Sequence, residues 1–207
     1  MAEHPEEEQF KHRFLDRNPS KVLAEVGIRT GHVVLDFGCG SGTYTIPAAK
    51  LVGDRGRVYA LDVNSSFLDK MEERAKQEGL KNIVRIDASK EGGIPLENET
   101  VDVMLVIDVL HLIEDREDLF DESYRILKGG GLIIVYPMHV AEEEVERLAH
   151  GGGLNLEERK FQGRILIYRK LIYKPQFSAK ASQKSEMVGV KNTVNNIGCE
   201  MSDTCGK

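Results

Sequence analysis

Residues 33–45 read VVLDFGCGSGTYT, with three glycines in five positions directly behind an apolar run. Glycine loses more conformational freedom on folding than any other residue, so the cluster predicts a backbone that turns sharply or passes close to a ligand. A carboxylate, Asp36, stands just before the loop. The apolar run predicts a buried strand over residues 32–37, and the loop is expected to lead into a helix over residues 43–52.

Strand-like and helix-like segments alternate along the rest of the sequence. The hairpin signal at the end consists of segments 154–161 and 164–170, separated by Gln162 and Gly163. Alternating strands and helices with apolar strands indicate an α/β fold, in which helices cover both faces of a parallel sheet and the hairpin extends one edge. We expect the other strands at 57–63 and 82–87, within 101–110, and after a loop in 129–137; helices are expected at 19–28, 65–78, 116–127 and 141–150.

Three regions are expected along the chain. Residues 1–18 are polar and carry Phe10 and Phe14 one helical turn apart, which indicates either a helical lid over a ligand or a helix that packs on the domain. The main domain is expected over residues 19–173. Residues 174–207 are rich in Ser, Lys, Asn and Gly and predict a polar, flexible tail.

Composition and charge narrow the function classes. The formal net charge of the 207 residues is −6, which argues against a nucleic-acid partner because phosphate binding needs a concentrated basic face. No apolar run approaches the roughly 20 residues of a membrane span. The acidic N-terminus lacks the apolar core of a signal peptide, so a cytoplasmic location is expected. Three sparse cysteines, Cys39, Cys199 and Cys205, lack the spacing of a disulfide framework or a zinc site, and we predict no metal.

The glycine loop and a second carboxylate point to a nucleoside ligand. In open α/β sheets, ligands bind outside the carboxyl ends of the strands, where the loop is expected to lie. The following helix would direct backbone N–H groups at such a ligand. Asp62 ends the second strand, about 20 residues beyond the loop, where a carboxylate can accept hydrogen bonds from both ribose hydroxyls. An adenosine-type cofactor is therefore predicted.

The spacing of the glycines discriminates between cofactors. Dinucleotide-binding loops favour G-x-G-x-x-G, whereas this loop has G-x-G-x-G and places Thr43 at the third glycine position. The carboxylate of Asp36 would repel a pyrophosphate but suits a cationic amino group or a sulfonium. These charges favour S-adenosylmethionine.

Four segments of the sequence resemble the class I S-adenosylmethionine-dependent methyltransferases, in the expected order and over roughly residues 20 to 170. The segment VLDFGCGSGTYT resembles the first motif of that family, and VYALDVNSSFL resembles its second-strand segment. The third- and fourth-strand segments of small methyltransferases, such as those of ubiquinone/menaquinone biosynthesis, resemble RIDASKEGGIPLENETVDVMLVIDVLHLIED. Their fifth-strand segment resembles YRILKGGGLIIVYP. The resemblance implies a Rossmann-like, doubly wound, mostly parallel seven-stranded sheet of order 3-2-1-4-5-7-6 with a C-terminal antiparallel hairpin.

The resemblance also implies a role for each residue of the predicted site. Asp36 would reach the methionine end of the cofactor, Asp62 would hold the ribose hydroxyls, and Asp87 would accept a hydrogen bond from the adenine amino group. Asp62 and Asp87 could instead only cap helices, with Asn64 the better cap candidate. The other implied cofactor-binding residues are Gly38, Cys39, Gly40 and Gly42 in the loop, Val63 or Asn64 and Ala88 beside the adenine, and Ile107 and Asp108 at the methyl end.

The acceptor side of the site is less defined. The best general-base candidates are Asp108 and His111, just past the fourth strand, with His139 a weaker one; a base matters only when the accepting atom carries a proton. His111 could also have a purely structural role. The resembling family commonly has a small residue at the position of Cys39, which favours a packing role for Cys39 over that of a nucleophile. The chain has IDVL where the resembling enzymes that methylate exocyclic amines or glutamine amides usually carry (N/D)-P-P-(Y/F). A small-molecule acceptor is expected, with oxygen, carbon, sulfur or a small amine left open.

Two other functions stay open at this point. A nicotinamide-dependent oxidoreductase is disfavoured by the glycine spacing and by Asp36. A methyltransferase-fold module that binds the cofactor without catalysis agrees with the same residues. The sequence leaves the acceptor and a homo-oligomeric state undecided.

Overall fold

A computed structural model describes residues 18–88 and 93–172 of the chain. The predicted lid, apart from its last residue, and the predicted tail lie outside the described residues. The strands are β1 (Val33–Phe37), β2 (Arg57–Asp62), β3 (Ile83–Asp87), β4 (Val101–Ile107), β5 (Leu127–Tyr136), β6 (Leu154–Lys160) and β7 (Ile165–Lys170). The helices are α2 (Pro19–Glu25), α3 (Thr45–Val52), α4 (Ser65–Gln77), α5 (Arg116–Ile126), α6 (Glu142–Gly151) and the short 3₁₀ helix η2 (Leu110–Leu112).

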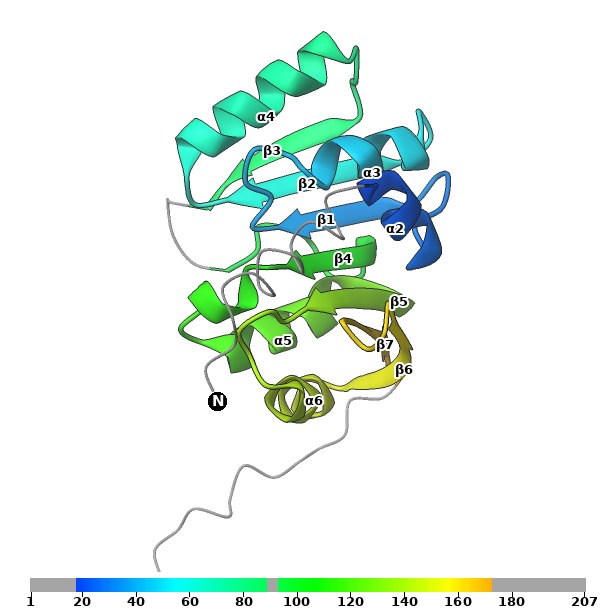
Figure 1. The fold of residues 1–207 in the computed structure, drawn as a ribbon, viewed down its shortest axis with the longest axis vertical. Helices are drawn as coiled ribbons and strands as arrows, with labels where there is room; N and C mark the ends of the chain where they lie inside the picture. The colour runs from blue at the N-terminus through cyan, green and yellow to red at the C-terminus, as the bar shows by residue number, and fades with distance from the viewer. Residues whose placement is uncertain (1–17, 89–92, 173–207) are drawn as a thin grey trace, which may run out of the picture. The chain divides into compact units, whose positions relative to one another are not determined.

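The seven strands form one sheet in the order β3-β2-β1-β4-β5-β7-β6 (Figure 1). The first five strands of this order pair in parallel, and β7 pairs antiparallel with β5 and β6. The doubly wound, mostly parallel fold with a closing hairpin is thereby confirmed. Because β1 lies between β2 and β4, the chain changes direction across the sheet there, which is where such folds bind ligands.

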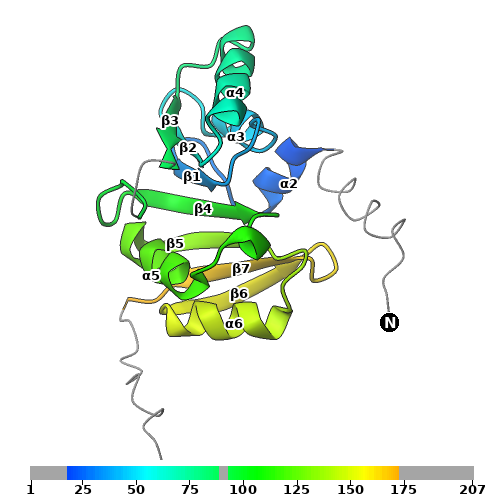
Figure 2. The same ribbon diagram turned by 90° about the vertical axis from the view of Figure 1, so that its left-hand side faces the viewer.

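Helices cover both faces of the sheet (Figure 2). One apolar layer joins α2 and α3 to the sheet, and α4 continues this side over β2 and β3. The other layer packs α5 and α6 against the opposite face. In the described part of the β3–β4 connection, Ala88 and residues 93–100, the chain forms no α-helix. Ala88, Gly93 and Ile94 of this connection line a pocket that is described below.

Element boundaries differ from the prediction by two or three residues at several places. Helix α2 ends at Glu25 rather than at residue 28, and β5 begins at Leu127 and so includes the glycines expected to form a loop. The fourth strand ends at Ile107, as expected, because Asp108 has a φ of 55° that ends the extended backbone, and η2 follows. Helix α3 begins at Thr45 rather than at residue 43. The glycine turn is therefore longer than predicted and separates the strand from the helix more widely.

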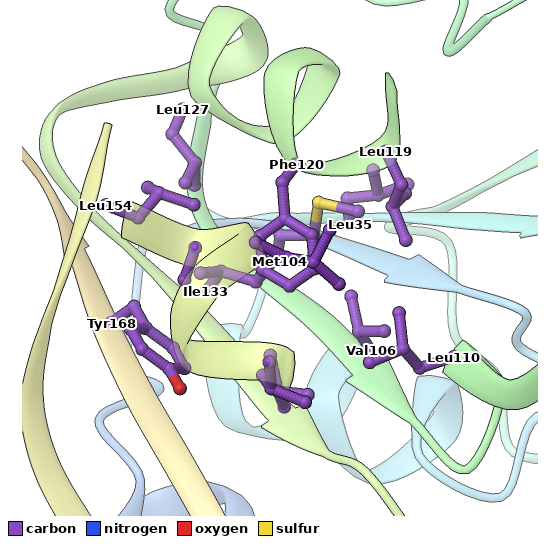
Figure 3. Packing of buried hydrophobic residues seen from close by; sticks show 14 of the residues in the cluster. Leu35, Met104, Val106, Leu110, Leu119, Phe120, Leu127, Ile133, Leu154 and Tyr168 are labelled. Atoms are coloured by element: carbon purple, nitrogen blue, oxygen red, sulfur yellow. The ribbon is translucent and has the colours of Figure 1, made fainter. Parts of the chain in front are cut away.

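The layer beneath α5 and α6 contains the two largest fully buried side chains of the described residues, Tyr168 and Phe120. Figure 3 shows the ring of Phe120 pointing from α5 toward Met104 on β4, with Leu35 and Ile133 from the neighbouring strands around it. Phe120 and Met104 have no exposed surface. Close packing at this depth leaves little room for relaxation when volume is removed.

Phe120→Ala is expected to lower the free energy of unfolding by about 3–5 kcal/mol, because the lost burial adds to the cost of a cavity. Leu112→Ala is the matched control, since Leu112 is 69% exposed, and its effect should stay within about 0.5 kcal/mol. Urea denaturation followed by circular dichroism measures both variants. Equal effects of the two substitutions would contradict the packing described for α5.

Candidate functional site

The glycine loop lies at the carboxyl end of β1 and is shaped by two close contacts. A Cβ at Gly38 would lie 2.5 Å from a methyl of Val109, and one at Gly42 would lie 2.7 Å from Cγ of Met71. Gly40 differs, because a Cβ there would meet no atom within 4 Å. The outer glycines thus let neighbouring side chains pack against the backbone, and the middle one faces open space that a ligand can approach.

Asp62 connects this loop to the end of β2. Its Oδ2 accepts a hydrogen bond of 2.8 Å from the backbone N–H of Gly40, and its Oδ1 accepts one of 2.8 Å from Asn64. Asn64, and not Asp62, caps α4, because its side chain accepts from the N–H of Ser66. Both oxygens of Asp62 are therefore held in place at the loop, with lone pairs left to accept from ligand hydroxyls.

Asp36 is buried beneath the loop. Only 2% of its surface is exposed, and its Oδ2 accepts a 2.5 Å hydrogen bond from the hydroxyl of Thr45. The pKa of Asp36 is raised to about 6, mainly by desolvation on burial and also by the negative charge of Asp62, while the hydrogen bonds from Thr45 oppose the shift. A cation placed above the loop would favour the ionised form. That Asp36 serves the methionine end of a cofactor stays a prediction.

The side predicted for adenine is apolar and open. Val63, next to Asp62, is 67% exposed. Asp87 lies opposite Asp62 in the β2–β3 pairing, and its Oδ2 accepts a 2.6 Å hydrogen bond from the hydroxyl of Ser65. Val63 and Ala88 line a pocket of about 210 Å³ together with Phe37, Leu61, Ile94, Ile113 and Leu119. Sequence reasoning missed Phe37 and Leu61, although strand alternation places both on the sheet face opposite Asp36.

Two further predicted residues are buried. Cys39 packs with Ala60, Leu68 and Met71 against α4, and burial raises the pKa of its thiol far above the usual range. A protonated, buried thiol is a poor nucleophile, which favours the packing role. Ile107 lies 6% exposed in the layer beneath α2 and α3. Whether its backbone lines the methyl end stays a prediction.

The residues after β4 and β5 gather at the same edge of the sheet. His111 in η2 has its Nδ1 4.0 Å from Oδ1 of Asp108. The rings of His111 and His139 meet edge to face, with centroids 4.8 Å apart and an interplanar angle of 74°. The structure thus brings together the two predicted base candidates and the weaker third one, through the pairing of Ile107 with Tyr136.

A separate cavity of about 510 Å³ lies at the opposite, amino end of the strands and is lined mainly by charged side chains and by Gly129–Gly131. Asp102 there accepts hydrogen bonds from the N–H of Val33, at 2.8 Å, and from Lys128, at 2.9 Å. These contacts join the starts of β1, β4 and β5. Asp102 therefore has a structural role far from the glycine loop.

The raised pKa of Asp36 makes stability depend on pH. The folded state holds this proton up to about pH 6, whereas the unfolded chain loses it near 3.8, so ionisation destabilises the fold as the pH rises between these values. Asp36→Asn removes this penalty. From about pH 4.5 to about pH 7.5, its unfolding free energy should rise relative to wild type by about 2 kcal/mol. Urea denaturation at both pH values measures the change, and a difference that does not vary with pH would contradict it.

The chain is similar in sequence and in fold to known proteins. A family model described as a methyltransferase domain matches residues 35–135. The ubiquinone/menaquinone biosynthesis C-methyltransferase UbiE of Marinomonas sp. (strain MWYL1) is 28% identical over 134 residues, which are 65% of this chain and 52% of that protein. The protein of the same name from Pseudoalteromonas translucida (strain TAC 125) is 31% identical over 125 residues, 60% of this chain and 50% of that protein. The chain thus spans about half the length of the curated relatives it matches.

A solved structure extends the match over the fold. The crystal structure of a SAM dependent methyltransferase from Aquifex aeolicus is similar with a TM-score of 0.67 and 25% identity, over 83% of this chain and 100% of that one. None of the helices in the described ranges has the length and apolar character needed to cross a membrane.

The matching family model and the similar solved structure together show that the chain contains a methyltransferase domain of the class I, S-adenosylmethionine-dependent family.

Proposed function

We propose that the protein transfers a methyl group from S-adenosylmethionine to a small-molecule acceptor. The observation that carries this proposal is the position of Asp62, whose two oxygens are fixed by backbone N–H groups beside the open surface of Gly40. A carboxylate held in this way suits two adjacent hydroxyls of a ribose. The apolar pocket beside it, lined by Val63 and Ala88, suits a flat base.

Each residue of the site has a proposed task. Asp62 would hold the ribose, Val63 and Ala88 would flank the adenine, and Asp87 would accept from its amino group. Gly38, Cys39, Gly40 and Gly42 would form the backbone surface beneath the cofactor, whereas Asp36, Ile107 and Asp108 would surround the methionine and methyl end. The raised pKa of Asp36 supports this placement, because a bound sulfonium or ammonium would favour its carboxylate.

The chain's part in the chemistry is mainly alignment. S-adenosylmethionine supplies an activated methyl group when bound. The loop and the edge after β4 would hold the acceptor in line with it and exclude water, and alignment of this kind contributes up to about 7–11 kcal/mol. For an acceptor that carries a proton, we propose that His111 or Asp108 would remove it.

The relatives of the chain bear on both the identity of the acceptor and the rival functions. The names of the relatives specify C-methylation in quinone biosynthesis, but the chain covers only about half of each, so we propose no more than a small-molecule acceptor. The family match disfavours a nicotinamide-dependent oxidoreductase. A cofactor-binding module without catalysis stays the main alternative, and a cytoplasmic location stays a prediction.

Asp62→Asn is expected to weaken binding of S-adenosylhomocysteine roughly 10- to 150-fold, because hydrogen bonds to a charged group contribute about 1.5–3 kcal/mol. Isothermal titration calorimetry is the measurement of choice, since the chain has no tryptophan. Asp54→Asn, in an exposed turn, is the matched control and should bind as the wild type does. Unchanged affinity of Asp62→Asn, or binding of NADH in place of S-adenosylhomocysteine by the wild type, would overturn the proposal.

His111→Gln is expected to lower turnover by about 10²- to 10⁴-fold with a hydroxyl or thiol acceptor, while the affinity for S-adenosylhomocysteine stays the same. Transfer of labelled methyl groups to a pool of metabolites first identifies the acceptor, and His150→Gln on α6 serves as the control. Full turnover of His111→Gln would remove His111 from the catalytic residues. Tight cofactor binding with no transfer to any metabolite, with or without candidate partners, would favour the non-catalytic module.

A further inference from the structure

We propose that Asp108, His111 and His139 form a binding site for one divalent transition-metal ion, of the class of Zn²⁺, Fe²⁺ or Co²⁺. The sequence analysis predicted no metal, because it searched for paired cysteines and found none. The three side chains come from three positions in the chain: the end of β4, the 3₁₀ helix η2 and the segment after β5. Metal binding at this place would go beyond methyl transfer and does not require it.

The donor atoms of the three residues converge. One ligand atom from each lies within 4.8 Å of the other two. In the part of the chain that the structure describes, no other trio of His, Cys, Asp or Glu side chains comes together in this way. Ligand atoms about 2.1 Å from one ion at a tetrahedral angle are roughly 3.4 Å apart, so closure around an ion needs small side-chain movements only.

The distance between the side chains of Asp108 and His111 is longer than that of a hydrogen-bonded pair. A histidine that hydrogen-bonds to a carboxylate has its nitrogen about 2.6–3.2 Å from the oxygen. The 4.0 Å between Nδ1 of His111 and Oδ1 of Asp108 is too long for that bond. It exceeds the separation of roughly 3.4 Å between two ligands of one ion by only about 0.6 Å, which a small side-chain movement would close.

The surroundings of His111 supply a second, independent observation. Its Nδ1 is buried and has no hydrogen-bond partner among the described residues. A buried nitrogen without a partner costs about 1–3 kcal/mol, and such groups in native structures call for an explanation. Coordination of an ion by this lone pair would satisfy it. His139 is exposed, so an ion can reach the site from solvent.

The backbone at Asp108 supports the same interpretation. Its φ of 55° is uncommon for a residue with a side chain, and such conformations persist at functional sites where the surroundings hold them. The turn places the carboxylate beside His111 instead of continuing β4. A plain strand ending would not need this conformation.

The donor set decides the class of ion. Two imidazoles and one carboxylate suit zinc and the other borderline transition metals, and sites with three protein ligands keep a coordination position open. Mg²⁺ and Ca²⁺ prefer oxygen ligands throughout. If the proposed function holds, the open position would take an acceptor oxygen or sulfur, and the ion rather than a side-chain base would favour its deprotonated form.

Co²⁺ is the probe that tests the site, because its visible absorption reports the ligands. The full chain with Cys199→Ser and Cys205→Ser is titrated with Co²⁺, so that the cysteines of residues 174–207 cannot bind the ion. One Co²⁺ per chain is expected, with ligand-field bands of a four- or five-coordinate site. Zn²⁺ should displace it in equimolar amounts, and a large excess of Mg²⁺ should not.

Three variants of this protein identify the ligands. Asp108→Asn and His139→Gln should each weaken Co²⁺ binding at least 100-fold, whereas His150→Gln should leave it unchanged. Because His139 is exposed, its variant tests the site even where Asp108→Asn fails to fold. Absence of a 1:1 complex, or unchanged affinity in His139→Gln, would overturn the proposal. Calorimetry with S-adenosylhomocysteine on the same proteins, without metal, keeps a failed metal site distinct from a failed methyltransferase assignment.

Discussion

The pair of hydrogen bonds that Asp62 accepts from Gly40 and Asn64 is the interaction on which the site depends. It joins the loop after β1 to the end of β2 and to the start of α4. The N–H groups of Gly38 and Cys39 add bonds to the carbonyl of Leu61 at 2.9 and 3.0 Å. Both oxygens of Asp62 are already oriented, so a ligand that forms hydrogen bonds to them would bind with little entropic cost for ordering this side chain.

The same region concentrates negative charge on a partly desolvated surface. Asp36 is buried beneath the loop, and Asp62 stands above it near enough to raise its pKa. Two carboxylates so placed destabilise each other in an empty site, and a cationic ligand would relieve the repulsion. This electrostatic arrangement explains why the loop would suit a sulfonium nucleoside and disfavour a pyrophosphate. The neighbouring pocket adds apolar contact area from side chains such as Phe37, Leu61 and Val63, and Asp115, Asp118 and Glu122 add further acidic groups to its lining.

Local patterns predicted most of the fold and the cofactor side of the site. The apolar runs identified the strands, and the spacing from the loop to Asp62 identified the second carboxylate, because parallel strands bring their carboxyl ends to one edge. The resemblance supplied the strand order. The backbone conformation at the end of β4 could not be predicted, since nothing in the apolar run VIDVL indicates that Asp108 turns to positive φ.

The acceptor side was harder to predict because it depends on long-range pairing. His139 lies near His111 only because β5 pairs with β4 in the observed register and η2 folds back after it. The burial of Asp36 also depends on tertiary contacts, since its partner Thr45 belongs to the first turn of α3. Residue type and position alone selected the candidate side chains, and the tertiary structure decides which of them lie together.

A crystal structure of the protein soaked with S-adenosylhomocysteine tests the central claim most directly. Our account predicts that the nucleoside lies over Gly40, with both ribose hydroxyls donating to Asp62 and the adenine beside Val63. An empty crevice at saturating ligand, or a nucleoside bound elsewhere with Asp62 turned into solvent, would contradict it.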